Sequence, residues 1–181
     1  MKGIVFTEFL EMVEEKFGLE TADKVITTSK VENGGAYTAV GTYNHKDILE
    51  MVTALASLIN SPVSPLVKVF GHHLAKVFVK KFPDFFSSQK TLFDFLISID
   101  GYIHVEVRKL YPEAELPTFS HRKIRENCLE LTYKSQRPFA DLASGLIDGC
   151  IEHYGEKIKV SYQDLDDNGC HRRFTLVREL I

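Results

Sequence analysis

Apolar residues recur at intervals of three and four along most of the first two thirds of the chain. This spacing places them on one face of a helix and predicts helices over residues 4–17, 20–29, 47–59 and 64–82. Ser61-Pro62 interrupts the pattern before the fourth helix, and Ser64-Pro65 supplies an N-cap with proline at the first helical position. We expect a loop over 31–43 and a short link over 84–88, where the periodicity fails.

The longest periodic stretch runs from Leu92 to Tyr111 and is predicted to form one helix that ends at Pro112. His104 lies within an otherwise apolar face of this helix. The residues assigned to that face are Phe93, Leu96, Ile97, His104, Val107, Leu110 and Tyr111. From periodicity alone, a hydrogen-bonded core histidine is favoured over a ligand at such a position, because buried polar groups usually have a partner.

After Pro112 the apolar positions alternate, as is typical of strands. The pattern predicts an extended segment over 116–125, a strand over 128–134, a helix over 138–154, and a terminal hairpin built from 158–162 and 174–178. The predicted fold is therefore α+β, with an N-terminal helical subdomain followed by a mixed subdomain that contains a small antiparallel sheet. We expect one domain over 1–181, divided into 1–62 and 63–181.

Composition and charge narrow the class of protein. The chain has 181 residues, of which 44% are hydrophobic and 26% charged, as in a globular protein with a sizeable core. Its net charge of −3 argues against nucleic acid as a partner. No apolar run approaches the roughly 20 residues that span a bilayer, and the first residues do not resemble a signal peptide, so we expect no membrane association. Three separated cysteines favour a reducing, cytoplasmic location.

The run Tyr133-x-Ser135-x-Arg137 places two hydroxyls and a guanidinium at alternate positions. On a strand these side chains lie on one face, and arginine can hold a carboxylate through two hydrogen bonds. His104 would supply a neutral imidazole, which is a common metal ligand. A ligand with one metal and two carboxylates, such as heme, would satisfy both features. Polar alternation is equally typical of any half-solvated strand, so the triplet alone leaves a structural role open.

Two further pairs are weak candidates for metal sites. His72 and His73 are neighbours on a predicted helix and point about 100° apart, so they cannot share one metal without help. Cys170-His171 supplies only two of the four ligands that structural zinc requires. The sequence therefore argues against zinc.

Five short sequence motifs occur in the same order, and at the same intervals, as in a known protein family. They are Met1-Lys2-Gly3, Phe70-Gly71, His104 seven residues before Tyr111-Pro112, Leu116-Pro117, and Tyr133-x-Ser135-x-Arg137. In these motifs the chain resembles, over essentially its whole length, the heme nitric oxide/oxygen binding (H-NOX) domain, which also forms the N-terminus of soluble guanylate cyclases. The Y-x-S-x-R run is the most specific of the five.

The resemblance implies a non-covalent b-type heme (iron protoporphyrin IX) enclosed by the fold, and the sequence has no C-x-x-C-H run for covalent attachment. His104 is then the proximal iron ligand, and Pro117 presses on the porphyrin. The two propionates are held by Tyr133, Ser135 and Arg137. Residues 1–62 become the distal subdomain, and 63–181 the proximal subdomain.

By the same resemblance, gas selectivity depends on the distal pocket. Some relatives place a tyrosine there, and Leu142 stands at that position. The residues that the resemblance assigns to the pocket are Val5, Phe9, Leu74, Phe78, Leu142 and Leu146. None carries a hydroxyl group, and bound O₂ depends on a hydrogen-bond donor far more than NO or CO does. We therefore expect a sensor that binds NO and CO in preference to O₂.

The resemblance also implies a signalling mechanism, in which NO weakens the bond between iron and His104 and the N-terminal helices then shift. The protein would be a sensor rather than an enzyme, with a separate histidine kinase or cyclic-di-GMP enzyme as effector. Several relatives carry a zinc cluster of three cysteines and a histidine, whereas this hairpin holds only Cys170 and His171. Two alternatives stay open. One is an O₂-binding or redox heme protein, and the other is a heme-free enzyme that uses His72, His73 or His104 as a base.

Overall fold

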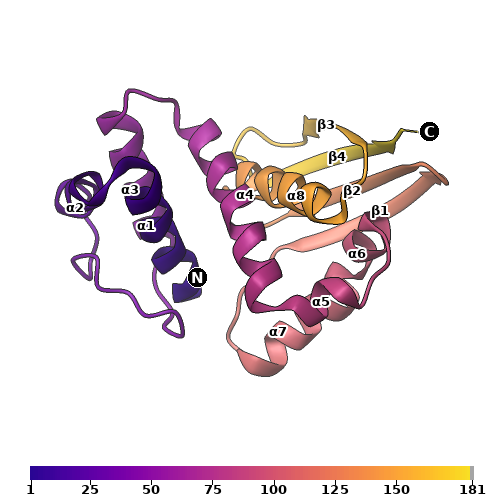
Figure 1. Cartoon of the computed structure of the whole chain (residues 1–181), viewed down its shortest axis with the longest axis horizontal. Helices are drawn as coiled ribbons and strands as arrows, with labels where there is room; N and C mark the ends of the chain where they lie inside the picture. The colour runs from indigo at the N-terminus through magenta and orange to yellow at the C-terminus, as the bar shows by residue number, and fades with distance from the viewer. Residues whose placement is uncertain (180–181) are drawn as a thin grey trace.

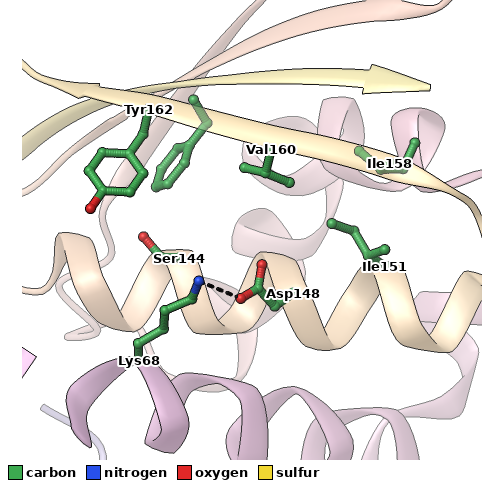
Figure 2. Close-up of a pocket in the computed structure, with 8 residues that line it drawn as sticks. Lys68, Ser144, Asp148, Ile151, Ile158, Val160 and Tyr162 are labelled. Carbon is green, nitrogen blue, oxygen red and sulfur yellow. Dashed lines mark ion pairs between the residues drawn. The ribbon is translucent and has the colours of Figure 1, made fainter. Parts of the chain in front are cut away.

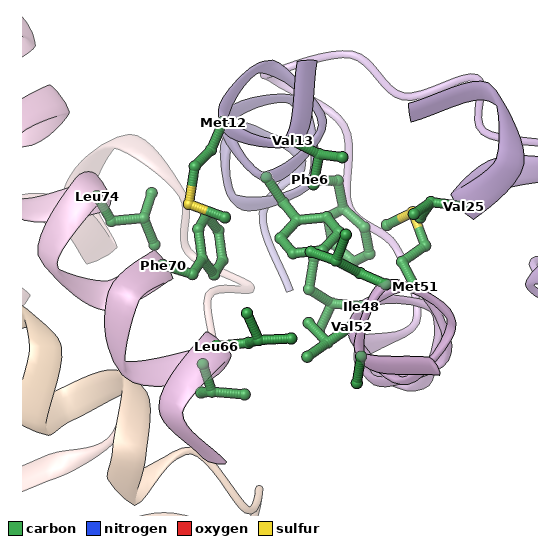
Figure 3. Close-up of a cluster of buried hydrophobic side chains, with 14 of the residues drawn as sticks. Phe6, Met12, Val13, Val25, Ile48, Met51, Val52, Leu66, Phe70 and Leu74 are labelled. Atoms are coloured by element: carbon green, nitrogen blue, oxygen red, sulfur yellow. The ribbon is translucent and has the colours of Figure 1, made fainter. Parts of the chain in front are cut away.

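The computed structural model describes residues 1–179, which begin with three helices grouped on one side of the molecule (Figure 1). They are α1 (Gly3–Phe17), α2 (Leu19–Thr28) and α3 (His45–Leu58). Their apolar faces meet in a first hydrophobic cluster, drawn in Figure 3, whose fully buried members include Phe6, Met12 and Met51. The three helices predicted here from periodicity are therefore confirmed.

The long helix α4 (Val63–Lys81) connects these helices to the rest of the chain. Leu66, Phe70 and Leu74 belong to the first cluster, while Ala75 belongs to a second cluster formed by the sheet and the later helices. Figure 1 shows α4 lying between the N-terminal helices and α8 (Ala140–Tyr154). A movement of α4 would therefore disturb both clusters.

Helices α4 and α8 approach so closely that their contact requires glycine. A Cβ atom on Gly71 would lie 2.2 Å from the carbonyl oxygen of Leu142, and one on Gly145 would lie 1.9 Å from that of Lys68. Both distances are far below van der Waals contact, so the two backbones leave no room for a side chain. The contact fixes the spacing of the side chains that α4 and α8 present to the first cluster.

The prediction of a single helix over 92–111 is wrong in the middle of that range. The structure has α6 (Leu92–Ser98), a π-helical turn (Ile99–Ile103) and α7 (His104–Leu110) in its place. The wider turn changes the angular position of the residues that follow, so the predicted common face does not persist. Leu110, which was assigned to that face, is 66% exposed. The predicted link over 84–88 also differs, because it contains α5 (Pro83–Ser87).

The C-terminal part forms a four-stranded antiparallel sheet in the order β1-β2-β4-β3. The strands are β1 (Thr118–Arg125), β2 (Cys128–Lys134), β3 (Ile158–Asp164) and β4 (His171–Arg178). Phe119 of β1 lies opposite Tyr133 of β2, which in turn lies opposite Arg172 of β4. Helix α8 packs on this sheet in the second cluster (Figure 1). The predicted α+β fold is therefore confirmed.

Within residues 1–179, no single helix has the length and apolar composition needed to cross a membrane. The pair α3 and α4, bent by 116° at the break between them, meets the criterion by length and composition only. Both helices contribute buried residues to the first cluster.

Candidate functional site

His104 is the first residue of α7 and is only 9% exposed. Its Nδ1 atom lies 2.8 Å from Oδ1 of Asp100, four residues earlier. A carboxylate only accepts hydrogen bonds, so Nδ1 carries the proton and Nε2 keeps its lone pair. Burial lowers the pKa of His104 and outweighs the opposing effect of Asp100 on that pKa. The result is a neutral imidazole whose Nε2 is available to a metal.

The second oxygen of Asp100 is also engaged. Oδ2 accepts a hydrogen bond from the backbone N–H of Phe119 at 2.8 Å, and the ring centroid of Phe119 lies 6.1 Å from that of His104. Pro117, predicted to press on a porphyrin, is half-buried and lies two residues before Phe119. Sequence reasoning missed Asp100, although the i, i+4 spacing of an aspartate and a histidine on a predicted helix was a usable signal.

Tyr133, Ser135 and Arg137 lie close together, but not on one strand face as predicted. Strand β2 ends at Lys134, so only Tyr133 belongs to it and the other two lie in the segment that follows. The Tyr133 hydroxyl donates to the carbonyl oxygen of Arg137 at 3.3 Å, and the Arg137 N–H donates to Oγ of Ser135 at 3.1 Å. Hydrogen bonds within a turn, rather than strand alternation, therefore assemble the triplet.

The guanidinium of Arg137 already binds a carboxylate in this structure. It forms an ion pair with the side chain of Glu115, and its Nη1 donates to the Glu115 carbonyl oxygen at 3.4 Å. The Glu115 side chain is 74% exposed, whereas that of Arg137 is 14% exposed. Ion pairs with exposed partners contribute less than about 1 kcal/mol, so Glu115 is easily displaced. The half-buried fork of Arg137 is therefore suited to a carboxylate from another molecule.

The six residues predicted for the distal pocket all lie in the first hydrophobic cluster or against it. They come from α1, α4 and α8. Phe9 and Leu74 are each 1% exposed. The other four pack against the cluster: Val5, Phe78, Leu142 and Leu146. None of the six side chains has a group that donates a hydrogen bond, so together they form an apolar wall.

The donors present at these positions fit a heme. Within residues 1–179, no group of three or more His, Cys, Asp or Glu side chains is placed to hold a metal ion. A metal bound at His104 must therefore bring most of its ligands with it, as heme iron does. Arg137 matches the heme carboxylates in charge and geometry, and the apolar wall matches the hydrocarbon surface of the ring.

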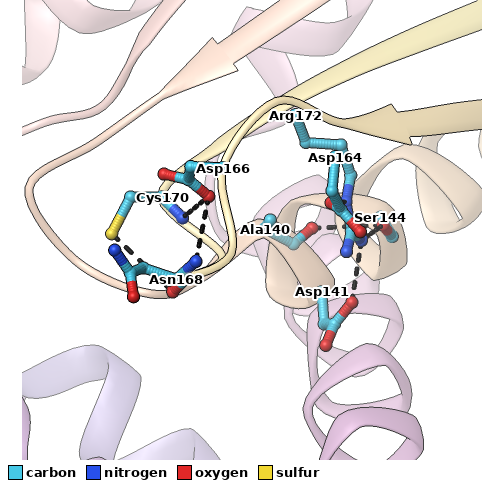
Figure 4. Close-up of polar contacts among 8 residues, drawn as sticks. All are labelled: Ala140, Asp141, Ser144, Asp164, Asp166, Asn168, Cys170 and Arg172. Atoms are coloured by element: carbon cyan, nitrogen blue, oxygen red, sulfur yellow. Dashed lines mark hydrogen bonds and ion pairs between the residues drawn. The ribbon is translucent and has the colours of Figure 1, made fainter.

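The turn between β3 and β4 supports the segment that carries Arg137. Oδ1 of Asp166 accepts the backbone N–H groups of Asn168 at 3.3 Å and of Cys170 at 3.1 Å (Figure 4). The Cys170 carbonyl oxygen in turn accepts the N–H of Ser135 at 2.9 Å. In the part of the chain that the structure describes, Cys170 belongs to no group of three or more potential metal ligands.

Arg172 is a buried charged residue. The alternation of apolar and polar residues in the sequence did not indicate that it is buried. Its Nε donates to Oδ1 of Asp164 at 2.5 Å, and its Nη1 donates to Oδ1 of Asp141 at 2.7 Å and to Oγ of Ser144 at 2.9 Å (Figure 4). Figure 4 shows these side chains converging from β3, β4 and α8. The network fixes α8, and with it Leu142, against the sheet.

A cavity of about 400 Å³ lies between α4, α8 and β3, and none of the predicted site residues lines it (Figure 2). Three of its polar side chains are already paired. Lys68 and Asp148 form an ion pair at 2.8 Å, and Ser144 accepts from Arg172. The cavity therefore offers few free groups to orient a ligand.

The adjacent histidines of α4 contact different carboxylates. Nε2 of His72 lies 2.7 Å from Glu152, whereas Nε2 of His73 lies 3.7 Å from Glu8 of α1. Glu8 also accepts a hydrogen bond from Lys81 at 2.6 Å. The two histidines do not form one site, as their angular separation predicts.

Comparison with known proteins identifies the family and the fold to which this chain is similar. The profile of the Haem-NO-binding family matches residues 2–162. The unliganded Fe(II) H-NOX protein from K. algicida is 36% identical with a TM-score of 0.94, covering 100% of this chain and 98% of that chain. The H-NOX protein from S. oneidensis in the Fe(II)NO state is 25% identical with a TM-score of 0.91, covering 99% of this chain and 100% of that chain.

A third solved structure is the H-NOX from Shewanella woodyi in the Fe(II)CO state. It is 39% identical with a TM-score of 0.85, covering 99% of this chain and 95% of that chain. Comparison with curated protein sequences gives no match.

Proposed function

The chain belongs to the Haem-NO-binding (H-NOX) family, and from this premise we propose that it is a nitric oxide sensor that binds a b-type heme without covalent attachment. The observation that carries the proposal is the imidazole of His104. Its Nδ1 forms a hydrogen bond with Asp100, and its Nε2 is free to bind a metal. Burial keeps the imidazole neutral by lowering its pKa. Solved relatives in the Fe(II)NO and Fe(II)CO states support NO and CO as the gas ligands.

Each predicted residue then has a distinct task. When bound, the heme iron supplies the position at which a diatomic gas binds. His104 would hold the iron through Nε2, and Arg137 would bind a heme carboxylate in place of that of Glu115. Tyr133 and Ser135 hold the Arg137 turn by hydrogen bonds, and we assign their hydroxyls to the same carboxylates. Pro117 has a rigid ring without an N–H, which suits it to press on the porphyrin.

The apolar distal wall supports selectivity for NO. Leu142, Leu74 and Phe9 exclude water and offer no donor to a bound gas. A neutral hydrogen bond contributes about 0.5–1.5 kcal/mol, and more when the acceptor carries charge, so its absence weakens O₂ binding in particular.

For signalling, we propose that residues 1–62 form a distal subdomain that moves relative to 63–181 and is read by a separate effector. A histidine kinase or a cyclic-di-GMP enzyme in the cytoplasm fits this arrangement. Polar links that join the parts include Lys2 to Glu113 at 2.6 Å and Glu8 to Lys81 at 2.6 Å. Release of His104 would change the position of α7, and the Lys2 link would transmit part of that change to α1.

The experiment is heme uptake by the wild type, His104→Gly and, as a matched control, His121→Gly on the exposed strand β1. Absorption spectra of the ferrous proteins are recorded in air and with NO. We expect His104→Gly to lose heme and to regain it with added imidazole, while the control behaves as wild type. If heme content and spectra are unchanged in His104→Gly, His104 is not the iron ligand. A stable oxygenated spectrum of the wild type in air would instead favour an O₂-binding protein.

A further inference from the structure

Asp100 lies inside the π-helical turn that precedes His104 and uses both of its carboxylate oxygens. Oδ1 lies 2.8 Å from Nδ1 of His104, and Oδ2 lies 2.8 Å from the backbone nitrogen of Phe119. Both partners are donors, so the position requires a side chain with two separate acceptors. Among neutral or acidic side chains of this length, only aspartate provides two.

We propose that Asp100 is a positioning residue for the iron ligand, an inference that rests on the proposed function. Its carboxylate holds His104 in the tautomer that leaves Nε2 free, orients the ring, and makes the imidazole a stronger donor to the metal. A carboxylate hydrogen-bonded to the other nitrogen of a metal-binding histidine has this effect in general. The π-helical turn is the backbone feature that places the carboxylate beside the ring.

Asp100 also joins the iron ligand to the carboxylate-binding segment. Phe119, which it holds through the backbone, lies directly opposite Tyr133 in the β1–β2 register, and the two rings have centroids 5.5 Å apart. Tyr133 in turn donates to the carbonyl oxygen of Arg137. Asp100 therefore connects the proposed iron ligand, His104, through β1 and β2 to the segment that carries Arg137.

Asparagine at position 100 separates the two tasks with almost no change in shape. If its oxygen stays with Phe119, its NH₂ group faces Nδ1, which favours the tautomer with the proton on Nε2 and blocks the metal. If its oxygen stays with His104, its NH₂ group opposes the N–H of Phe119 and the tie to β1 is lost. Either choice removes one of the two hydrogen bonds.

The test compares wild type, Asp100→Asn, Asp100→Glu and the matched control Asp94→Asn. Asp94 is an exposed carboxylate on the same helical segment, and it accepts from Oγ1 of Thr91 at 2.6 Å. Three readouts are taken: the iron–histidine stretching band of the ferrous protein, the rate of heme loss, and the hydrogen exchange of the Phe119 amide in the heme-free protein.

We expect Asp100→Asn to lower the stretching frequency, to weaken heme retention by roughly ten- to a hundredfold, and to speed exchange at Phe119. Asp100→Glu keeps two acceptors and should recover part of the frequency, while Asp94→Asn should match wild type in all three. An unchanged stretching band in a folded, heme-bound Asp100→Asn protein overturns the inference but leaves the proposed function standing. A wild type that takes up no heme through His104 overturns the proposed function itself.

Discussion

The contact between α4 and α8 makes a sharp prediction about Gly145. Replacing it with alanine would place a methyl group 1.9 Å from the carbonyl oxygen of Lys68. That oxygen is backbone and cannot rotate away, so the two helices must separate. Overpacking of this kind typically costs about 1–3 kcal/mol, and the backbone partner places Gly145→Ala at the upper end.

The gain in helix propensity offsets part of this cost. Alanine is about 1 kcal/mol more favourable than glycine within a helix. The net destabilisation is therefore about 2 kcal/mol. For a domain of 150–250 residues, each kcal/mol lowers the midpoint of thermal unfolding by about 2–4 °C, so we expect a fall of about 4–8 °C.

The assay is thermal unfolding of the heme-free protein followed by circular dichroism, with Gly101→Ala as the matched control. A Cβ on Gly101 meets no atom within 4 Å, so this variant should be as stable as wild type or slightly more stable. The close-contact argument is refuted if Gly145→Ala unfolds at or above the wild-type midpoint.

Four further predictions follow from the site and the core. Arg137→Ala should speed heme loss, because a charge-assisted hydrogen bond contributes about 1.5–3 kcal/mol. Glu115→Gln should speed heme uptake, because it removes the carboxylate that competes for Arg137. Stopped-flow heme transfer measures both rates. Leu142→Tyr should add a distal donor worth about 0.5–1.5 kcal/mol and raise O₂ affinity up to roughly tenfold, and a variant with unchanged O₂ affinity would count against the apolar-wall argument. Pro117→Ala should relax the porphyrin and shift the ferric/ferrous potential, and a planar heme in the wild type would contradict this. Burial raises the pKa of the Cys150 thiol to about 12, so at pH 8 it stays protonated and should react with alkylating agents only after unfolding, as mass spectrometry can show.

The sequence predicted the fold because the apolar spacing is regular where helices and strands are amphipathic. The helices at 3–17 and 140–154 and the strands at 128–134 and 171–178 occur close to their predicted positions. The π-helical turn was missed because one irregular turn leaves the three- and four-residue spacing on either side intact. Asp100 in this turn pairs with both His104 and Phe119, and only the second contact depends on the position of another element, β1.

The residues of the candidate site were chosen from the sequence, but the geometry expected for three of them differs from that in the structure. Ser135 and Arg137 were placed on a strand face, yet β2 ends at Lys134 and a turn brings them together. The strand predicted over 128–134 already ended at the observed residue, so the error was to extend its alternation to positions 135 and 137. The burial of Arg172 was invisible in the local pattern, because its partners Asp141 and Asp164 lie on other elements.

The magnitudes of the links between the two parts of the chain limit how a signal can cross them. Lys2 pairs with Glu113 at 2.6 Å and lies 4.2 Å from the ring centroid of Tyr111, just beyond the end of α7. A surface ion pair contributes about 0.2–1 kcal/mol and an exposed cation–π contact about 0.5–1 kcal/mol, so this link supplies at most about 2 kcal/mol. Converting an equilibrium from 1:99 to 99:1 requires about 5.5 kcal/mol. The rest of the coupling in the proposed switch must therefore come from other contacts. These include the Glu8–Lys81 pair and the apolar contacts of α4, whose Phe70 and Leu74 pack in the first cluster while Ala75 packs in the second.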